Sequence, residues 1–138
     1  MFKKLATVAM ICLPLPALAG IDFLDRQRFV IPVAPISATT FEVIENDGAG
    51  GTQMWCAAAK YSRAVLGNAR GDLTILEARD TARTVQGRKG VVFTTAPVDG
   101  AFSSVSQSVR RAGKVFSVGH AYALCPRFGG RVTVRVLR

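Results

Sequence analysis

Residues 52–67, TQMWCAAAKYSRAVLG, carry the clearest helical pattern of the sequence and its only tryptophan. At 100° per residue the large apolar side chains gather on one broad face, and Lys60 and Arg63 lie opposite. We therefore predict a helix over Thr52–Gly67, around which the other elements have to pack. Cys56 lies on the flank of the apolar face, within the first turn. A cysteine there can form a disulfide with a neighbouring element, or can be a nucleophile activated by nearby basic residues and the helix start.

The start of the chain has the three regions of a secretory signal peptide in their usual order. Lys3 and Lys4 form a charged region, an apolar run follows that is too short to span a bilayer as a helix, and Ala-Leu-Ala fits a cleavage site before Gly20. An amphipathic helix of a cytosolic protein does not explain this order. We predict a signal peptide over residues 1–19, a single domain over residues 20–138, and an exported protein that is periplasmic or secreted.

Two cysteines remain after removal of this leader, because Cys12 leaves with it. Cys56 and Cys125 make an even count in an oxidising compartment, where disulfides form and persist. We therefore expect a disulfide between Cys56 and Cys125, which closes a loop around most of the domain. The bond requires that the element carrying Cys125 approaches the Cys56 helix closely.

Runs of β-branched residues and of alternating polarity predict the strands. They cover Thr39–Glu45, Leu73–Arg79, Gly90–Thr95, Lys114–Cys125 and Arg131–Arg138. Before them, Pro32 and Pro35 remove backbone donors, so residues 20–37 are expected to form an extended arm or an edge strand. A serine cap and an apolar stripe predict a short second helix over Ser103–Ala112.

The predicted strand Lys114–Cys125 has bulky side chains at one parity and mostly small ones at the other. Its small face allows the helix to approach closely at Ala57–Ala59. The element order is then arm, strand, helix, strand, strand, short helix, strand, strand. The simplest assembly is an α+β fold in which an antiparallel sheet of about five strands carries the Cys56 helix on one face.

A thiol-dependent hydrolase is the alternative to a structural disulfide. Cys56 on a helix and His120 on a later strand resemble the general layout of papain-like and cell-wall peptidase folds, without a family motif around either residue. Cys125 and His120 are five residues apart, so in a regular strand they point to opposite faces. If Cys56 bonds Cys125, it cannot also use His120 unless a bulge at Gly119 intervenes. We expect the disulfide and no catalytic residue.

The glycine-rich loop Asp47–Thr52 precedes the helix, where free N–H groups can hold an anion. It lacks the glycine that a dinucleotide fingerprint needs and the lysine that a P-loop needs. We interpret this loop as a flexible entry to the helix rather than as a ligand loop, and no motif indicates a cofactor.

The chain has a formal net charge of +9, which removal of the leader lowers to +7. Such a basic surface attracts anionic partners, either an anionic envelope component or an acidic protein. The candidate binding residues are Arg131 and Arg135, which share one strand face, and the neighbouring pair Arg110 and Arg111. The alternative is a solvated basic surface that has no defined partner. The exported location argues against nucleic acid, and a single histidine without an acidic cluster argues against a metal site.

The leader, the segment WCAAAKYSRAVLG and the later YALCPR resemble small secreted proteins of alphaproteobacteria. The resemblance covers roughly the mature domain through its two cysteines. It implies a bacterial periplasmic setting and no particular activity. We therefore predict a non-enzymatic interaction or structural module of the cell envelope, with a basic surface and no membrane-spanning segment.

Overall fold

The computed structural model describes residues 27–126 and 130–138. The predicted signal peptide, residues 1–19, and the first residues of the predicted mature domain lie outside them. Within the described residues the chain forms an α+β fold of six strands and two helices. The strands are β1 (Arg28–Pro35), β2 (Thr40–Ile44), β3 (Asp72–Thr81), β4 (Lys89–Thr94), β5 (Val115–Ser117) and β6 (Arg131–Val136). The helices are α2 (Gly51–Ala64) and α3 (Val118–Ala123).

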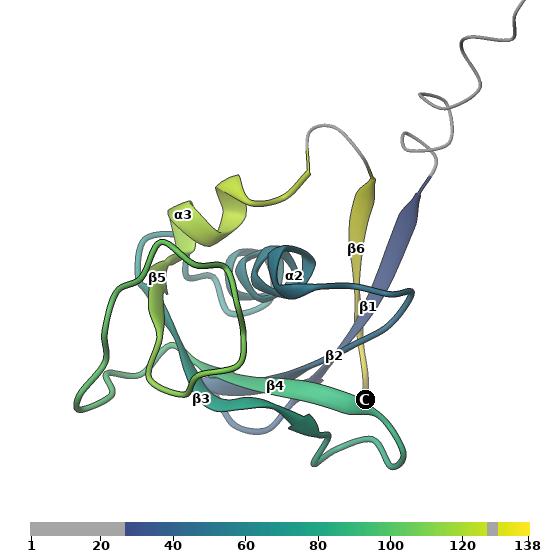
Figure 1. Ribbon diagram of the computed structural model, residues 1–138, viewed down its shortest axis with the longest axis horizontal. Coiled ribbons are helices and arrows are strands. Elements are labelled where there is room, and N and C mark those ends of the chain that lie inside the picture. Colours follow the sequence, from purple (N-terminus) through teal and green to yellow (C-terminus); the bar gives the residue numbers. More distant parts are fainter. Residues whose placement is uncertain (1–26, 127–129) are drawn as a thin grey trace, which may run out of the picture.

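The strands form one curled sheet in the order β5-β3-β4-β2-β1-β6, and α2 lies against its inner side (Figure 1). Neighbouring strands are antiparallel except β1 and β6, which run parallel. The expected sheet was purely antiparallel with about five strands, so the prediction was wrong in strand number and in the direction of β6. Alternating polarity shows which face of a strand is buried, but it carries no information on strand direction.

β1 is an internal strand although it contains Pro32 and Pro35. The backbone N–H and C=O groups of its even-numbered residues point toward β2. There the N–H of Val30 donates to Asp47 Oδ2 (2.8 Å), and the carbonyl of Val30 accepts from Asn46 Nδ2 (2.7 Å). Pro32 lies just beyond the residues that pair with β2. Its missing N–H therefore falls where these side chains replace the backbone ladder. The expected edge strand was wrong for this reason, and residues 20–26 of the expected arm lie outside the described residues.

The predicted helix is confirmed as α2, which is buried along most of its length. α2 ends at Ala64, three residues before the predicted end, and Gly67 has a φ of +68°, the left-handed conformation common just after a helix. At the other end, a Cβ on Gly51 would lie 2.2 Å from the carbonyl oxygen of Gln107. The close approach of this backbone explains the need for a glycine where α2 begins.

The core lies between α2 and the sheet and is centred on aromatic rings. Trp55 of α2 packs against Phe93 of β4 and Phe116 of β5, with ring centroids 5.0 and 4.3 Å apart. The ring of Phe41 in β2 lies 4.5 Å from that of Tyr61, which follows Trp55 by about 1.7 turns along α2. These contacts hold α2 on the sheet at both ends of the helix.

An irregular segment replaces the predicted helix at Ser103–Ala112. Ser104, Ser106 and Ser108 each accept a hydrogen bond from the N–H two residues later, at 3.2, 3.2 and 3.3 Å. The serine side chains thus satisfy the backbone in a non-helical conformation. The predicted helix was wrong for this reason, and Val105, which it would have buried, is 99% exposed.

Lys114 fastens this irregular segment to the domain. Its side chain is buried, and Nζ donates to the carbonyls of Ser106 (3.1 Å) and Ser108 (2.6 Å). Burial lowers the pKa of the Lys114 ammonium, and the positive charge of Arg111 lowers it further. One of the cations of the basic surface expected from the sequence is therefore a buried structural group.

The predicted strand Lys114–Cys125 is a strand only as far as Ser117, where β5 ends and α3 begins. Ser117 caps α3, because its hydroxyl accepts from the N–H of His120 (3.0 Å). Val118 and Ala121 of α3 are buried, and α3 packs against α2. The rest of the predicted strand was wrong, because this capping serine starts a helical turn within the alternating pattern.

Candidate binding surface at the edge of the sheet

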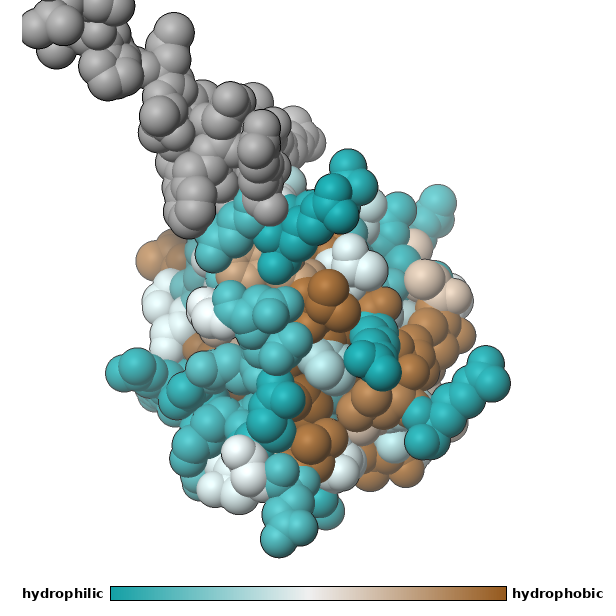
Figure 2. All heavy atoms as spheres, turned by 90° about the vertical axis from the view of Figure 1, so that its right-hand side faces the viewer, coloured by the Kyte–Doolittle hydropathy of each residue, from teal (hydrophilic) through white to brown (hydrophobic). Residues whose placement is uncertain are grey.

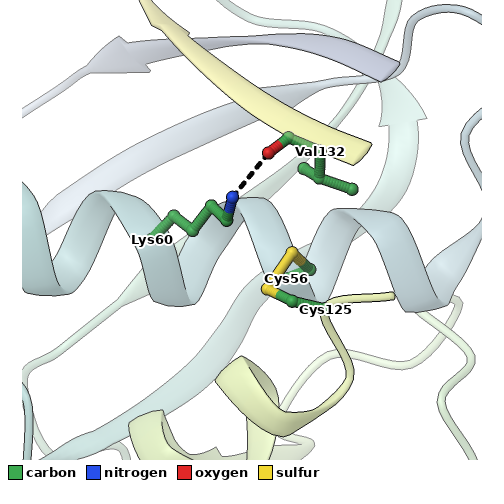
Figure 3. Close-up of a disulfide and its surroundings, with 4 residues drawn as sticks. All are labelled: Cys56, Lys60, Cys125 and Val132. Carbon is green, nitrogen blue, oxygen red and sulfur yellow. Dashed lines mark hydrogen bonds between the residues drawn. A yellow bond between two sulfur atoms is a disulfide. The ribbon is translucent and has the colours of Figure 1, made fainter. Parts of the chain in front are cut away.

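Cys56 of α2 and Cys125, which follows α3, form the predicted disulfide, with sulfur atoms 2.09 Å apart (Figure 3). Cys56 is fully buried. The bond holds the end of α3 against α2 just before the chain continues to β6. The disulfide therefore fixes the point at which the chain passes from one edge of the sheet to the other.

The alternative hydrolase site needs a free thiol on Cys56, whereas the Cys56 sulfur is bonded to Cys125 in this structure. His120 is exposed, and its ring lies 4.6 Å from the ring of Phe116. It belongs to α3 rather than to a strand, so the parity argument that set it opposite Cys125 does not apply. A site that uses Cys56 and His120 would require the reduced protein.

The parallel pairing of β1 with β6 brings together basic side chains that are far apart in the sequence. Arg28 lies in register with Arg131, and Arg135 follows on the same face of β6. Phe29, Ile31 and Val132, which have the other parity, are buried, so the three arginines lie on the outer face of the sheet. We call Arg28, Arg131 and Arg135 the basic strand patch.

The basic strand patch contains no acidic side chain. Between its arginines, the residues paired on the same face are Val30 and Thr133. None of the ion pairs between described residues involves a patch arginine. Figure 2 shows the side of the molecule on which β1 and β6 lie in Figure 1, where hydrophilic side chains stand around apolar surface. The sequence could not indicate Arg28, because its place beside Arg131 depends on the unpredicted parallel pairing.

Arg110 and Arg111 lie elsewhere. The N–H of Arg79 in β3 donates to the carbonyl of Val109 (2.9 Å), which places this segment beside β3. Three strands separate β3 from β6 in the sheet. The guanidinium of Arg111 also stacks 4.7 Å from the ring centroid of Phe102. The four arginines predicted as one candidate set therefore belong to two separate parts of the sheet.

An open groove of about 440 Å³ lies beside β6, at the second half of α2. Its lining includes Lys60, Arg63, Val65, Tyr122, Val134 and Val136. Val65, Tyr122 and Val136 are 50%, 40% and 40% exposed. The guanidinium of Arg63 lies 4.1 Å from the ring centroid of Tyr122, which positions this cation at the groove. The part of the lining contributed by described residues has two cations and no carboxylate.

Lys60 connects α2 to the edge of the sheet. Its ammonium donates to the carbonyl of Val132 in β6, with Nζ 2.6 Å from the oxygen (Figure 3). Lys60 therefore satisfies one backbone group of β6 that no neighbouring strand reaches. The sequence placed Lys60 on the polar side of the helix, but it gave no sign of this contact with β6.

Metal sites and membrane-spanning helices have no candidate in the part of the chain that the structure describes. Residues 27–126 and 130–138 contain no cluster of three or more histidine, cysteine, aspartate or glutamate side chains that could hold a metal ion. Over the same ranges, none of the helices has the length and apolar character needed to cross a membrane.

Comparison of this chain with protein-family models, with curated proteins and with solved structures gives no significant match.

Proposed function

We propose that this protein is a non-enzymatic, exported binding module of the cell envelope, which associates with an anionic partner through the basic strand patch. The observation that carries the proposal is the register of Arg28 with Arg131, with Arg135 on the same exposed face. A cluster of arginines creates a positive potential that attracts acidic groups. The carboxylate of Asp47 lies beside the patch, but it accepts a hydrogen bond from the backbone N–H of Val30 and forms no ion pair with a patch arginine. The Cys56–Cys125 disulfide supports an oxidising compartment, where such bonds persist.

A charge-reversal experiment tests this proposal. The double variant Arg131→Glu/Arg135→Glu should bind fluorescent polyglutamate about tenfold more weakly than the wild type, a loss of about 1.4 kcal/mol. The matched control is Arg70→Glu/Lys89→Glu, which reverses two exposed cations outside β1 and β6. We expect the control to bind within about twofold of the wild type, because exposed charges are screened beyond about 8 Å at physiological ionic strength.

Two results would contradict the proposal. Equal losses in the two double variants would show diffuse attraction without a defined surface. A wild-type affinity that does not change with salt would exclude an electrostatic association. Vesicles of anionic phospholipid, measured in parallel, separate a lipid surface from an acidic polypeptide as the preferred partner.

A further inference from the structure

The outer edge of β6 carries backbone groups that point away from the sheet. The N–H of Arg131 donates to the carbonyl of Gln27, and the N–H of Leu137 donates to that of Val33. In a parallel pair, the N–H and C=O of one residue point to the same side, and successive residues alternate. The odd-numbered residues of β6 therefore face β1, and the even-numbered ones face outward.

Two of these outward-facing residues have backbone groups that are free to accept a new strand. The third, Val132, already accepts a hydrogen bond at its carbonyl from Lys60 Nζ. On the same side, no backbone group of the described residues pairs with Val134 or Val136, because β6 is the last strand of the sheet. Each of the two presents one N–H and one C=O. This is the hydrogen-bonding pattern that an added strand needs.

The side chains around this edge differ on the two faces of the sheet. On the inner face, Val134 and Val136 line the groove with exposed Val65 and Tyr122. On the outer face, Arg131 and Arg135 are exposed. Successive residues of a strand alternate between faces. An extended segment beside β6 would therefore place every second side chain in the groove and the others next to arginines.

We propose that the edge of β6 binds an extended segment of an acidic protein, which adds to the sheet as a further strand. This inference rests on the proposed function and names its partner. Apolar residues of the segment occupy the groove, and aspartate or glutamate at the alternate positions pairs with Arg131 and Arg135. Opposite charges on directly neighbouring strands stabilise such a pair. Arg63 and Lys60 favour further carboxylates at the groove.

Charge also decides against a second copy of this chain as the partner. Pairing β6 with β6 of another molecule would place arginines beside arginines, which destabilises a cross-strand pair. The contact between Lys60 and Val132 ends the free edge on one side, so the docking segment is short.

The first test uses a short peptide of alternating glutamate and valine, blocked at both ends and labelled for fluorescence anisotropy. We expect it to bind at least about tenfold more tightly than a peptide of the same composition in which glutamates and valines are grouped. Equal affinity of the two peptides would overturn the inference.

Backbone N-methylation tests the hydrogen bonding directly. In an added strand only alternate N–H groups face β6. N-methylation of either the valines or the glutamates should therefore weaken binding at least about tenfold, and N-methylation of the other set should leave it nearly unchanged. The sensitive set also reports whether the segment runs parallel or antiparallel to β6. Equal effects of the two modifications would contradict strand addition.

A protein variant provides an independent check. Val134→Pro removes an outward N–H but no hydrogen bond to β1, and proline is tolerated at this parity of an edge strand. It should reduce peptide affinity at least about tenfold, whereas Val134→Thr, which keeps the N–H and the side-chain volume, should bind like the wild type. Circular dichroism establishes that both variants fold. If Val134→Pro does not fold, the N-methylated peptides decide.

The outcomes separate this inference from the proposed function. If polyglutamate binds in a patch-dependent way but the alternating peptide has no advantage, the proposed function stands and strand addition fails. If neither probe responds to Arg131→Glu/Arg135→Glu, both fail. Concentration-dependent dimerisation abolished by Val134→Pro would identify a second copy as the occupant and overturn the acidic segment.

Discussion

The two edges of the sheet are protected in different ways. β5, at one edge, has three residues and is followed at once by α3. Its outer side is covered by Phe102, whose carbonyl accepts from the N–H of Val115 (2.9 Å). β6, at the other edge, has six residues, and among described residues only Lys60 reaches its outward backbone, at Val132.

The difference shows two solutions to the same hazard. An unpaired edge is a template for pairing with other chains, so proteins shorten it, cover it or place charges on it. Here the β5 edge is shortened and covered, which prevents any strand from adding. The β6 edge is longer and is flanked by arginines, and under the proposed function it excludes most partners and admits one of opposite charge. We therefore expect the β6 edge to pair only with strands of suitable charge, and the β5 edge to pair with none.

Breaking the disulfide should have the largest effect on this arrangement, because Cys125 lies between α3 and β6. The bond closes a loop with a sequence separation of 69, so the entropic cost of that loop suggests a contribution of about 4 kcal/mol to the free energy of unfolding. Cys56→Ser and Cys125→Ser should each lose about this amount in urea denaturation, and the double variant little more.

Amide hydrogen exchange should then reveal the difference between the edges. In Cys125→Ser, two amides at the β6 edge should lose more protection than the amide of Val115 in β5. They are the amide of Arg131, which bonds to Gln27 just before β1, and that of Leu137, which bonds to Val33 of β1. β6 is held by a single neighbouring strand, whereas β5 is also bonded to Phe102. Equal loss at both edges would mean that the disulfide stabilises the whole domain without favouring β6.

The next largest effect should come from the two lysines that bond backbone carbonyls near the edges. Lys114 is buried and holds two carbonyls, whereas Lys60 is half-buried and holds one. Lys114→Met should lower the free energy of unfolding by about 2 kcal/mol, and Lys60→Met by about 1 kcal/mol. Guanidinium denaturation of both variants measures the ratio. A larger loss for Lys60→Met would mean that the β6 edge is the more firmly held of the two.

The smallest effect is the pH dependence of the Lys114 contribution. The folded protein lowers the pKa of Lys114 below its ordinary value of 10.5, so the unfolded chain binds this proton more tightly. Stability from this group therefore rises as the pH increases through the folded pKa towards 10.5. The difference in unfolding free energy between the wild type and Lys114→Met should grow over this interval. The opposing contribution of Tyr61, whose pKa is raised by burial, is present in both proteins and cancels. A difference that stays constant would show that Lys114 titrates alike in both states.

The sequence predicted the elements whose pattern is local. The helix around Cys56, the middle strands β2, β3 and β4, and the disulfide follow from periodicity and cysteine count, and the structure confirms them. It did not predict features that depend on competition or on distant partners. Serine hydroxyls displaced the helix expected at Ser103–Ala112, and Ser117 converted a strand into α3. Direction and register of β6 are tertiary properties, and so the place of Arg28 in the basic strand patch was not predictable.

The pairing of β1 with β6 joins the first and last strands that the structure describes, and this sets a condition on folding. The strands between them are paired through shorter loops and can associate while the polypeptide is still being made. The backbone groups of the odd-numbered residues of β1 can form their hydrogen bonds only after Arg131–Val136 has been synthesised. Completion of the sheet therefore depends on contacts of large sequence separation, which slow folding. Before β6 pairs, β1 has an unpaired edge, and Phe29, Ile31 and Val33 lie on the face that is buried in the folded domain. Pairing of the last strand that the structure describes is thus expected to be a late step in folding.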